Sequence, residues 1–105
     1  MTQEKKIEEL QILEQNIQGL LQNKQKFSQE LIEIENALTE LKTSKTTFKI
    51  VNSIMFEAQP EDLKKELTEK KEIIDVRIKT IEKEEDKIRK TAEELQKEVM
   101  KELKH

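Results

Sequence analysis

One group of side chains is dense enough to suggest chemistry, and it lies in the second half of the chain. Four carboxylates occur close together, at Glu82, Glu84, Glu85 and Asp86. Carboxylate oxygens are the ligands that Ca²⁺ and Mg²⁺ prefer, so a metal site is one interpretation. Lysines and arginines alternate with these acids, however, and this alternation is typical of a solvated helix face. We therefore expect no metal and no other cofactor.

Catalytic chemistry has little support in the residues. The single His is the terminal His105, and there is no Cys, Trp or Tyr. With one Gly in the chain, no phosphate-binding loop or dinucleotide fingerprint can be formed, and no nucleophile–base pair is recognisable. We predict that the chain is not an enzyme.

The composition differs from that of a compact globule. Of 105 residues, 41% are charged and 33% are hydrophobic, and the only aromatic residues are three Phe. Either disorder or a long helix that buries a narrow apolar stripe produces such values. The 20 basic and 23 acidic residues are closely mixed, with a net charge of -3. Nucleic-acid binding needs a basic patch or stripe, so we expect no nucleic-acid partner.

Targeting signals and cysteines are absent from the sequence. The first residues, Met1–Lys6, lack the apolar run of a signal peptide, and no stretch has the length of a membrane span. Without Cys there is no disulfide framework. We expect a cytoplasmic protein that does not associate with a membrane.

The spacing of apolar residues favours helices over disorder. From Leu10 to Leu41 the steps alternate between three and four, with Lys24 in the one gap. The spacing returns in the second half, where Glu85 fills one gap and the step from Leu67 to Ile74 spans seven residues. This pattern is the a/d seam of a coiled coil. Its members are Leu10, Leu13, Ile17, Leu20, Phe27, Leu31, Ile34, Leu38 and Leu41, then Leu67, Ile74, Ile78, Ile81, Ile88, Ala92, Leu95 and Val99.

Between the two seams the period changes. Residues 46–58 are rich in β-branched and aromatic types, with Asn52-Ser53 at their centre. Asn tolerates the positive φ of a two-residue hairpin turn, and Ser is a weaker choice beside it, which leaves the turn type open. We predict a single domain over 1–105, with helices over about 3–44 and 60–104 and a hairpin over about 46–58.

A single fold about Asn52-Ser53 aligns the two halves of the chain. Paired positions then sum to 105, so that Val51 faces Ile54 and the helical seams also match. The predicted fold class is mainly α: a long antiparallel two-helix coiled coil with one β-hairpin between the helices. Lys24 and Glu85 come within about one layer of each other. They either form a pair that fixes the register or both extend to water.

The predicted hairpin needs a partner. A lone two-stranded hairpin is marginal in water, and open strand edges invite pairing with another chain. We predict oligomerisation through it; the alternative is that it folds back on its own helices. The residues expected in the interface are Phe48, Ile50, Val51, Ile54, Met55 and Phe56.

The free end of the coiled coil carries apolar residues outside the seam. A cluster of this kind can form a patch for a partner, although single exposed apolar residues are ordinary. Fraying of the helix ends would add nearby seam residues to the patch. The predicted binding set is Ile7, Leu10, Ile12, Leu13, Val99, Met100 and Leu103.

The order helix, single hairpin, helix resembles the β-class subunit of prefoldin. Residues 22–27 and 37–41 are similar to the family's first helix, and 76–88 to its second. The stretch from Phe48 to Phe56 resembles the family's aromatic–Lys–aliphatic–Val–Gly strand and turn, except that Asn52 stands where Gly is usual. The resemblance covers nearly the whole chain.

The resemblance implies an ATP-independent chaperone. Prefoldin is a hexamer of two α-type and four β-type subunits, joined through their hairpins. The ends of its arms hold unfolded client proteins and pass them to a group II chaperonin. On this basis we expect an α-type subunit, further β-type subunits, unfolded clients and a group II chaperonin as partners.

Three alternative functions are considered. The first is a structural or scaffolding coiled coil that oligomerises without holding unfolded protein. The second is an arm of a larger enzyme, such as that of seryl-tRNA synthetase, which the net charge of -3 disfavours because RNA binding needs basic residues. A membrane-surface helix is disfavoured as well, since neither helix combines a basic face with a broad apolar one.

Overall fold

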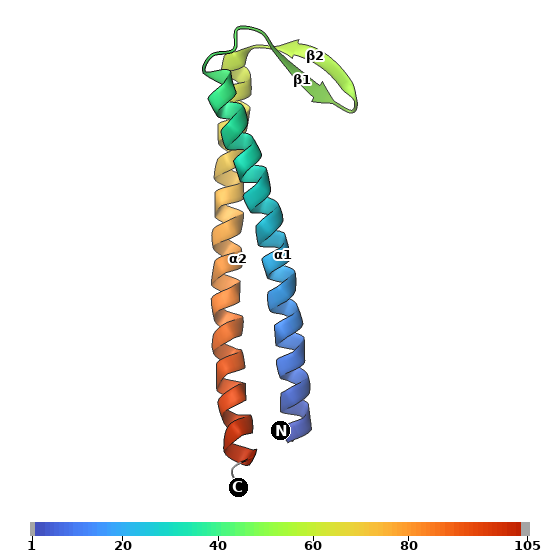
Figure 1. The fold of residues 1–105 in the computed structure, drawn as a ribbon, viewed down its shortest axis with the longest axis vertical. Helices are drawn as coiled ribbons and strands as arrows, with labels where there is room; N and C mark the ends of the chain where they lie inside the picture. Colours follow the sequence, from blue (N-terminus) through green and yellow to red (C-terminus); the bar gives the residue numbers. More distant parts are fainter. Residues whose placement is uncertain (1, 104–105) are drawn as a thin grey trace. The chain divides into compact units, whose positions relative to one another are not determined.

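The computed structural model describes residues 2–103 and contains two helices and one hairpin (Figure 1). The elements in chain order are α1 (Gln3–Leu41), β1 (Thr47–Val51), β2 (Ile54–Ala58) and α2 (Pro60–Leu103). The predicted fold class, a mainly α antiparallel coiled coil with one hairpin, is confirmed. The outermost residues of the predicted domain, Met1 and Lys104-His105, lie outside the described residues.

Local side-chain chemistry sets the ends of α1. At its start the Thr2 hydroxyl accepts a hydrogen bond from the Lys5 backbone N–H at 3.3 Å, as an N-cap does. At its other end the helix stops at Leu41, short of the predicted end near residue 44. There the Ser44 hydroxyl donates to the Glu40 carbonyl at 2.8 Å, which satisfies one of the orphan carbonyls of the last turn.

The start of α2 is as the sequence indicates. Pro60 is its first residue, where the missing N–H has no intrahelical partner to lose. Glu61 and Asp62 occupy the first turn, where the positive end of the helix dipole favours acids. The Leu63 N–H donates to the Gln59 carbonyl at 3.1 Å, so that the helical ladder begins from Gln59.

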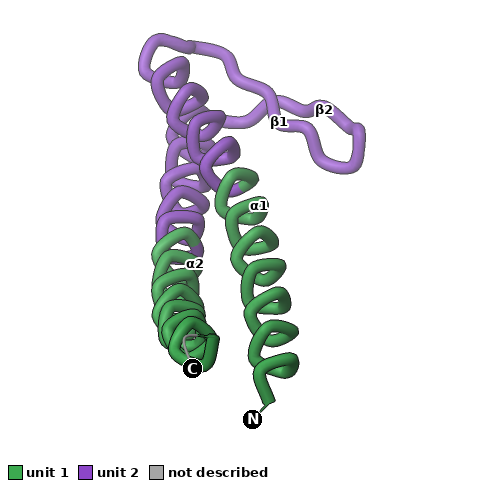
Figure 2. The backbone as a smooth tube through the Cα atoms, turned by 60° about the horizontal axis from the view of Figure 1, so that its bottom comes forward, with its two compact units in different colours: residues 1–26, 78–105 green, residues 27–77 purple. Residues whose placement is uncertain are grey.

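The chain divides into two compact units (Figure 2). Of the described residues, unit 1 contains 2–26 and 78–103, and unit 2 contains 27–77 with the hairpin. Within each unit, segments of α1 and α2 run antiparallel beside each other (Figures 1 and 2). The buried apolar residues are Ile81 and Val99 in unit 1 and Ile34 and Ile74 in unit 2.

The predicted seam is the core of both units. Every seam residue named from the sequence is buried or half-buried, including Lys24 and Glu85. Cross-helix contacts follow the predicted register to within about one helical turn. In unit 2, for example, Lys71 Nζ lies 3.6 Å from Glu35 Oε1, and the Arg77 guanidinium lies 5.6 Å from the centre of the Phe27 ring.

The hairpin has the predicted register. Thr47 pairs with Ala58 at one end and Val51 with Ile54 at the other. Asn52 and Ser53 form the turn, with φ values of 49° and 68°. Positive φ at both central residues is what a type I′ turn requires, and its twist matches that of the strands. The turn type that the sequence left open is therefore settled without a glycine.

Candidate assembly and binding surfaces

The six apolar residues expected in an interface all lie on the surface of the hairpin. We call them the hairpin surface, and their exposed fractions range from 41% to 65%: Phe48, Ile50, Val51, Ile54, Met55 and Phe56. The sheet has only two strands, so each strand has an unpaired edge. The fold-back alternative requires these side chains to be buried on the helices of their own chain; all six are exposed, although Phe48 and Ile50 also line a hollow beside α1 and α2.

The two faces of the hairpin differ in their surroundings. Phe48, Ile50 and Met55 share one face by strand alternation, and all three are exposed. On the other face Thr47 and Lys49 are half-buried. Lys49 Nζ lies 2.6 Å from Glu66 Oε1 on α2. The half-buried face is therefore the one that adjoins the helices of unit 2.

The seven residues expected at the free end fall into two groups. Ile7, Ile12, Met100 and Leu103 are exposed, and each is accessible without any change in the helices. The seam residues of the set are covered: Leu10 and Leu13 are half-buried. Val99, which is 8% exposed, is buried. Separation of the helix ends, which the sequence suggests through fraying, would be needed to expose these three fully.

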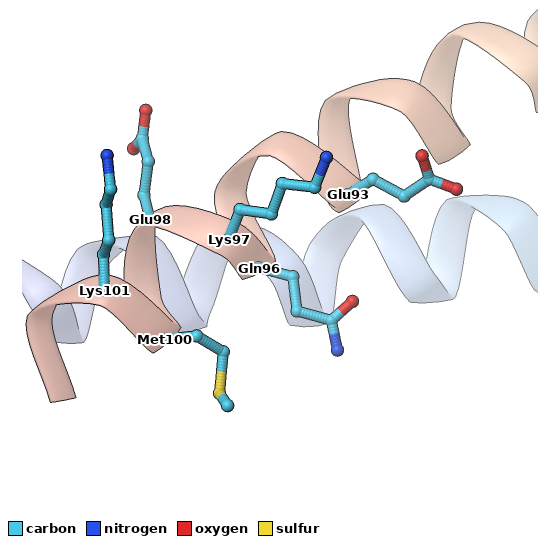
Figure 3. Close-up of a pocket in the computed structure, with 6 residues that line it drawn as sticks. All are labelled: Glu93, Gln96, Lys97, Glu98, Met100 and Lys101. Carbon is cyan, nitrogen blue, oxygen red and sulfur yellow. The ribbon is translucent and has the colours of Figure 1, made fainter. Parts of the chain in front are cut away.

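A groove of about 650 Å³ lies beside Met100 on α2 (Figure 3). We call it the Met100 groove. Figure 3 shows Met100 and Gln96 on one side of the helix and the charged Lys97, Glu98 and Lys101 on the other. A flexible thioether next to a neutral amide suits apolar side chains of varied shape. Charges of both signs at the rim give no preference for the net charge of a ligand.

Ion pairs that were not predicted from the sequence join the two helices at the end of the coiled coil. Lys6 Nζ lies 2.5 Å from Glu102 Oε1 and 3.4 Å from Glu98 Oε2. The hydrogen bond to Glu102 raises the pKa of the Lys6 amine, although burial of the amine acts in the opposite direction. Lys6 and Glu102 continue the three–four spacing of the seam outward, and this was the available signal.

A buried carboxylate interrupts the seam of unit 1. Glu85 is 4% exposed, and its Oε1 lies 3.4 Å from Lys24 Nζ while its Oε2 lies 3.4 Å from Arg89 Nη2. Lys24 and Glu85 therefore form a pair, one of the two outcomes that the sequence left open. Oε1 receives no hydrogen bond, so the pair satisfies the buried group only in part.

Two further features bear on other classes of function. Within residues 2–103, acidic and His side chains form no cluster of three or more that could hold a metal ion. Of the acidic run, Glu85 is buried, whereas Glu82, Glu84 and Asp86 are exposed. Neither helix, over the described part of the chain, has a stretch long and apolar enough to cross a membrane.

The fold and the exposed hairpin together indicate the class of protein to which the chain belongs. The fold is a two-helix coiled coil whose connecting hairpin displays apolar side chains from an open two-stranded sheet. The family described as Prefoldin subunit matches residues 4–105. The chain belongs to the prefoldin family.

Individual relatives agree with this assignment. Prefoldin subunit beta of Archaeoglobus fulgidus is 36% identical over 93 residues, which cover 86% of this chain and 80% of the relative. That of Sulfurisphaera tokodaii is 36% identical over 93 residues, covering 86% and 74%. The crystal structure of the prefoldin beta subunit from Thermococcus strain KS-1 has a TM-score of 0.91 and 26% identity, covering 98% of this chain and 93% of that one. The chain is a chaperone subunit of the prefoldin type.

Proposed function

We propose that this chain assembles through the hairpin surface into a hexamer with an α-type prefoldin subunit and further β-type subunits. The observation that supports this most directly is the exposure of all six apolar residues on a sheet with two open edges. An isolated two-stranded hairpin is marginal in water, so pairing with a strand of another subunit would stabilise it. The resemblance to prefoldin β subunits provides the expected stoichiometry.

In that assembly the chain acts as an ATP-independent holdase in the cytoplasm. Its free end holds unfolded proteins and passes them to a group II chaperonin. The exposed Ile7, Ile12, Met100 and Leu103 and the Met100 groove offer apolar contacts to segments of varied sequence. Each contact is weak, but several ends acting on one client gain affinity by multivalency.

The solution mass tests the assembly. Light scattering is measured on the chain alone and after mixing with an α-type prefoldin subunit. We expect a stable complex near six chains in the mixture. A chain that stays monomeric in both samples contradicts the proposal and favours the scaffolding alternative.

Substitutions in the hairpin surface add a matched control to this experiment. Ile50 and Met55 are cross-strand partners on the exposed face, and Ile50→Lys with Met55→Glu should prevent assembly. Ile73→Lys on α2 is the control, because Ile73 is 53% exposed and lies outside the hairpin. Both proteins should keep the helix signal in circular dichroism. Equal assembly of the two variants would refute the role of the hairpin surface.

A different assay distinguishes the holdase from the scaffolding alternative. A subunit that only oligomerises forms the complex but does not suppress aggregation of a denatured protein. The assembled complex is therefore mixed with a chemically unfolded protein, and light scattering follows aggregation after dilution. Suppression at near-stoichiometric amounts without nucleotide supports the holdase, and unchanged aggregation supports the scaffold.

A further inference from the structure

Two links of unequal length join the hairpin to the helices of unit 2. Residues 42–46 connect α1 to β1, whereas Gln59 alone separates β2 from α2. Pro60 follows with a fixed φ and restricts Gln59 to extended conformations, and the Gln59 carbonyl is already bound to the Leu63 N–H of α2. The φ angle of Gln59 is therefore the main backbone torsion on that side through which the angle between the hairpin and α2 can change.

An ion pair bridges the hairpin and α2 beyond this link. Lys49 lies at the centre of β1, and its Nζ is 2.6 Å from Oε1 of Glu66 in the second turn of α2. In the described range 2–103, no other ion pair joins the hairpin to a helix. A hollow of about 450 Å³ adjoins the pair. Both side chains line it, together with Phe48 and Ile50 of the hairpin and leucines of the two helices, Leu41, Leu63 and Leu67.

The hollow shows that apolar packing does not fill the space behind β1. A hairpin seated on the helix ends would be held by side-chain contacts over its whole face. Here the outer half of that face, Val51, Ile54 and Phe56, is exposed, and only Thr47, Lys49 and Ala58 are partly covered. The angle of the hairpin is thus set by few contacts, and Lys49–Glu66 is the one ion pair among them in the described part of the chain.

We propose that Lys49 and Glu66 form a strut that holds the hairpin at the angle required for assembly with neighbouring subunits. This inference rests on the proposed assembly function. Lys49 and Glu66 are positioning residues in it: they orient the hairpin surface and do not themselves contact the partner chain. Without the strut the hairpin samples a range of angles, and assembly must select the correct one.

The expected size of the effect follows from the exposure of the pair. The side chains are 35% and 54% exposed, so the pair is screened by water and biases the angle by at most about fivefold in each chain. In an assembly that contains several copies these biases multiply. Two copies give up to about 25-fold, which a measurement of the assembly midpoint resolves.

The test uses three variants of the full chain. Lys49→Met and Glu66→Gln each remove one charge and keep much of the side-chain shape, and Lys49→Glu with Glu66→Lys exchanges the two charges. The concentration midpoint for assembly with an α-type prefoldin subunit is measured by mass photometry. We expect each single variant to raise the midpoint measurably, by up to about 25-fold. The combination of Lys49→Met and Glu66→Gln should be no worse than either alone, because the two residues act as one pair.

The exchanged pair separates a strut from a direct contact. If the charges serve only to hold the angle, the exchanged variant assembles within about twofold of the unsubstituted chain. An exchanged variant as poor as the single variants would show that Lys49 or Glu66 contacts the partner, and it would overturn the strut. Additive effects of the single substitutions, or no effect at all, would overturn it as well.

A distance measurement tests the strut without assembly. The sequence contains no Cys, so Ser53→Cys and Glu69→Cys place two spin labels, one on the hairpin turn and one on α2. The distance distribution should be narrow in this background and clearly broader when Lys49→Met is added. Equal widths contradict the strut whatever the assembly result. A different result would contradict the proposed function but not the strut. In that case the unsubstituted chain does not assemble, yet its distance distribution is narrower than that of the Lys49→Met variant.

Discussion

Glu85 is the residue at which the seam of unit 1 departs most from an apolar core. Its carboxylate is 4% exposed and lies at 3.4 Å from both Lys24 Nζ and Arg89 Nη2. These distances are long for charge-assisted hydrogen bonds, which are usually about 2.7–2.9 Å. A group that is buried but weakly paired lowers stability relative to an apolar residue of similar size. We therefore expect Glu85 to contribute to the specificity of helix pairing, because polar seam residues disfavour other registers.

Substitution of the pair tests this division between stability and specificity. Lys24→Met alone leaves Glu85 with Arg89 only, and we expect a loss of about 1–3 kcal/mol in the free energy of unfolding by urea. Lys24→Leu combined with Glu85→Leu should instead raise that free energy, since both residues then join the apolar seam. The same double variant should form additional oligomers in sedimentation velocity. If it remains one species identical to the parent, the pair does not specify the register.

Lys6 gives a prediction about pH. Hydrogen bonding to Glu102 raises the pKa of its amine above the ordinary value of 10.5. A raised pKa in the folded state means that the pair stabilises the helix end fully below about pH 10.5, and that this stabilisation is lost as the pH rises through the higher folded value. A ¹³C NMR titration of the lysine side chains should show Lys6 titrating later than the exposed lysines. Glu102→Gln should lower its pKa, and an unchanged value would contradict the contact.

At the scale of elements, the hairpin is the least conventional part of the chain. Both turn residues, Asn52 and Ser53, have positive φ, a region that residues other than Gly, Asn and Asp rarely enter. Asn tolerates it through its short polar side chain, but Ser gains little. The turn is nonetheless fixed by its length, because two residues between paired strands select the primed turn types.

Replacement of Ser53 by Gly should therefore stabilise the hairpin. Gly adopts positive φ without the steric penalty, which for an L-residue is about 1–2 kcal/mol. Amide hydrogen exchange of β1 and β2 should slow by up to about tenfold in Ser53→Gly. Asn52→Val is the opposing control, because a β-branched residue fits this region worst and should speed exchange. Slower exchange in both variants would mean that the positive φ values of the turn residues do not limit the stability of the hairpin.

At the scale of the whole molecule, the two surfaces to which we assign assembly and client binding lie in different parts of the chain. The hairpin surface belongs to unit 2, and the exposed Ile7, Ile12, Met100 and Leu103 belong to unit 1. Each surface lies in its own compact unit, so removal of one need not unfold the other. This separation lets assembly and client binding be tested independently.

Deletion of Met1–Leu13 and Lys97–His105 is the corresponding experiment. It removes the whole predicted binding set and leaves the hairpin surface intact. The shortened chain should still assemble with an α-type subunit in light scattering, and it should lose suppression of aggregation. The full-length complex carrying Ile73→Lys serves as a control for changes in exposed apolar area elsewhere. Full activity of the shortened chain would exclude the free end as the client site.

Most of the fold could be predicted from the sequence because the coiled coil encodes it locally. A residue lies in the seam when it follows the preceding seam residue by three or four positions. Every residue that this rule places in the seam is buried or half-buried in the structure. The hairpin then fixes the offset, since a two-residue turn allows a single alignment of Val51 with Ile54. The end of α1 was missed because capping by Ser44 depends on the route of the loop, which has no period.

The candidate surfaces could be predicted only in part. Residue type and position identified the hairpin and free-end residues, but type alone did not separate the exposed Met100 from the buried Val99, its neighbour in the chain. The seam pattern did separate them, because Val99 occupies a seam position and Met100 does not. The pairs Lys49–Glu66 and Lys6–Glu102 join residues remote in sequence, and many other acids and bases were equally available to either lysine.

The sequence by itself determined the helices, the strand pairing and the membership of the seam, because each follows from a repeat or a turn that acts over a few residues. Only the tertiary structure decided that the hairpin surface is exposed, that Lys24 and Glu85 pair, and that Lys49 reaches Glu66. These outcomes depend on the path of the backbone through residues 42–46 and Gln59, and on which of several charged side chains pair with each other. A repeat of apolar residues in the sequence determines neither the backbone path nor the choice of partner.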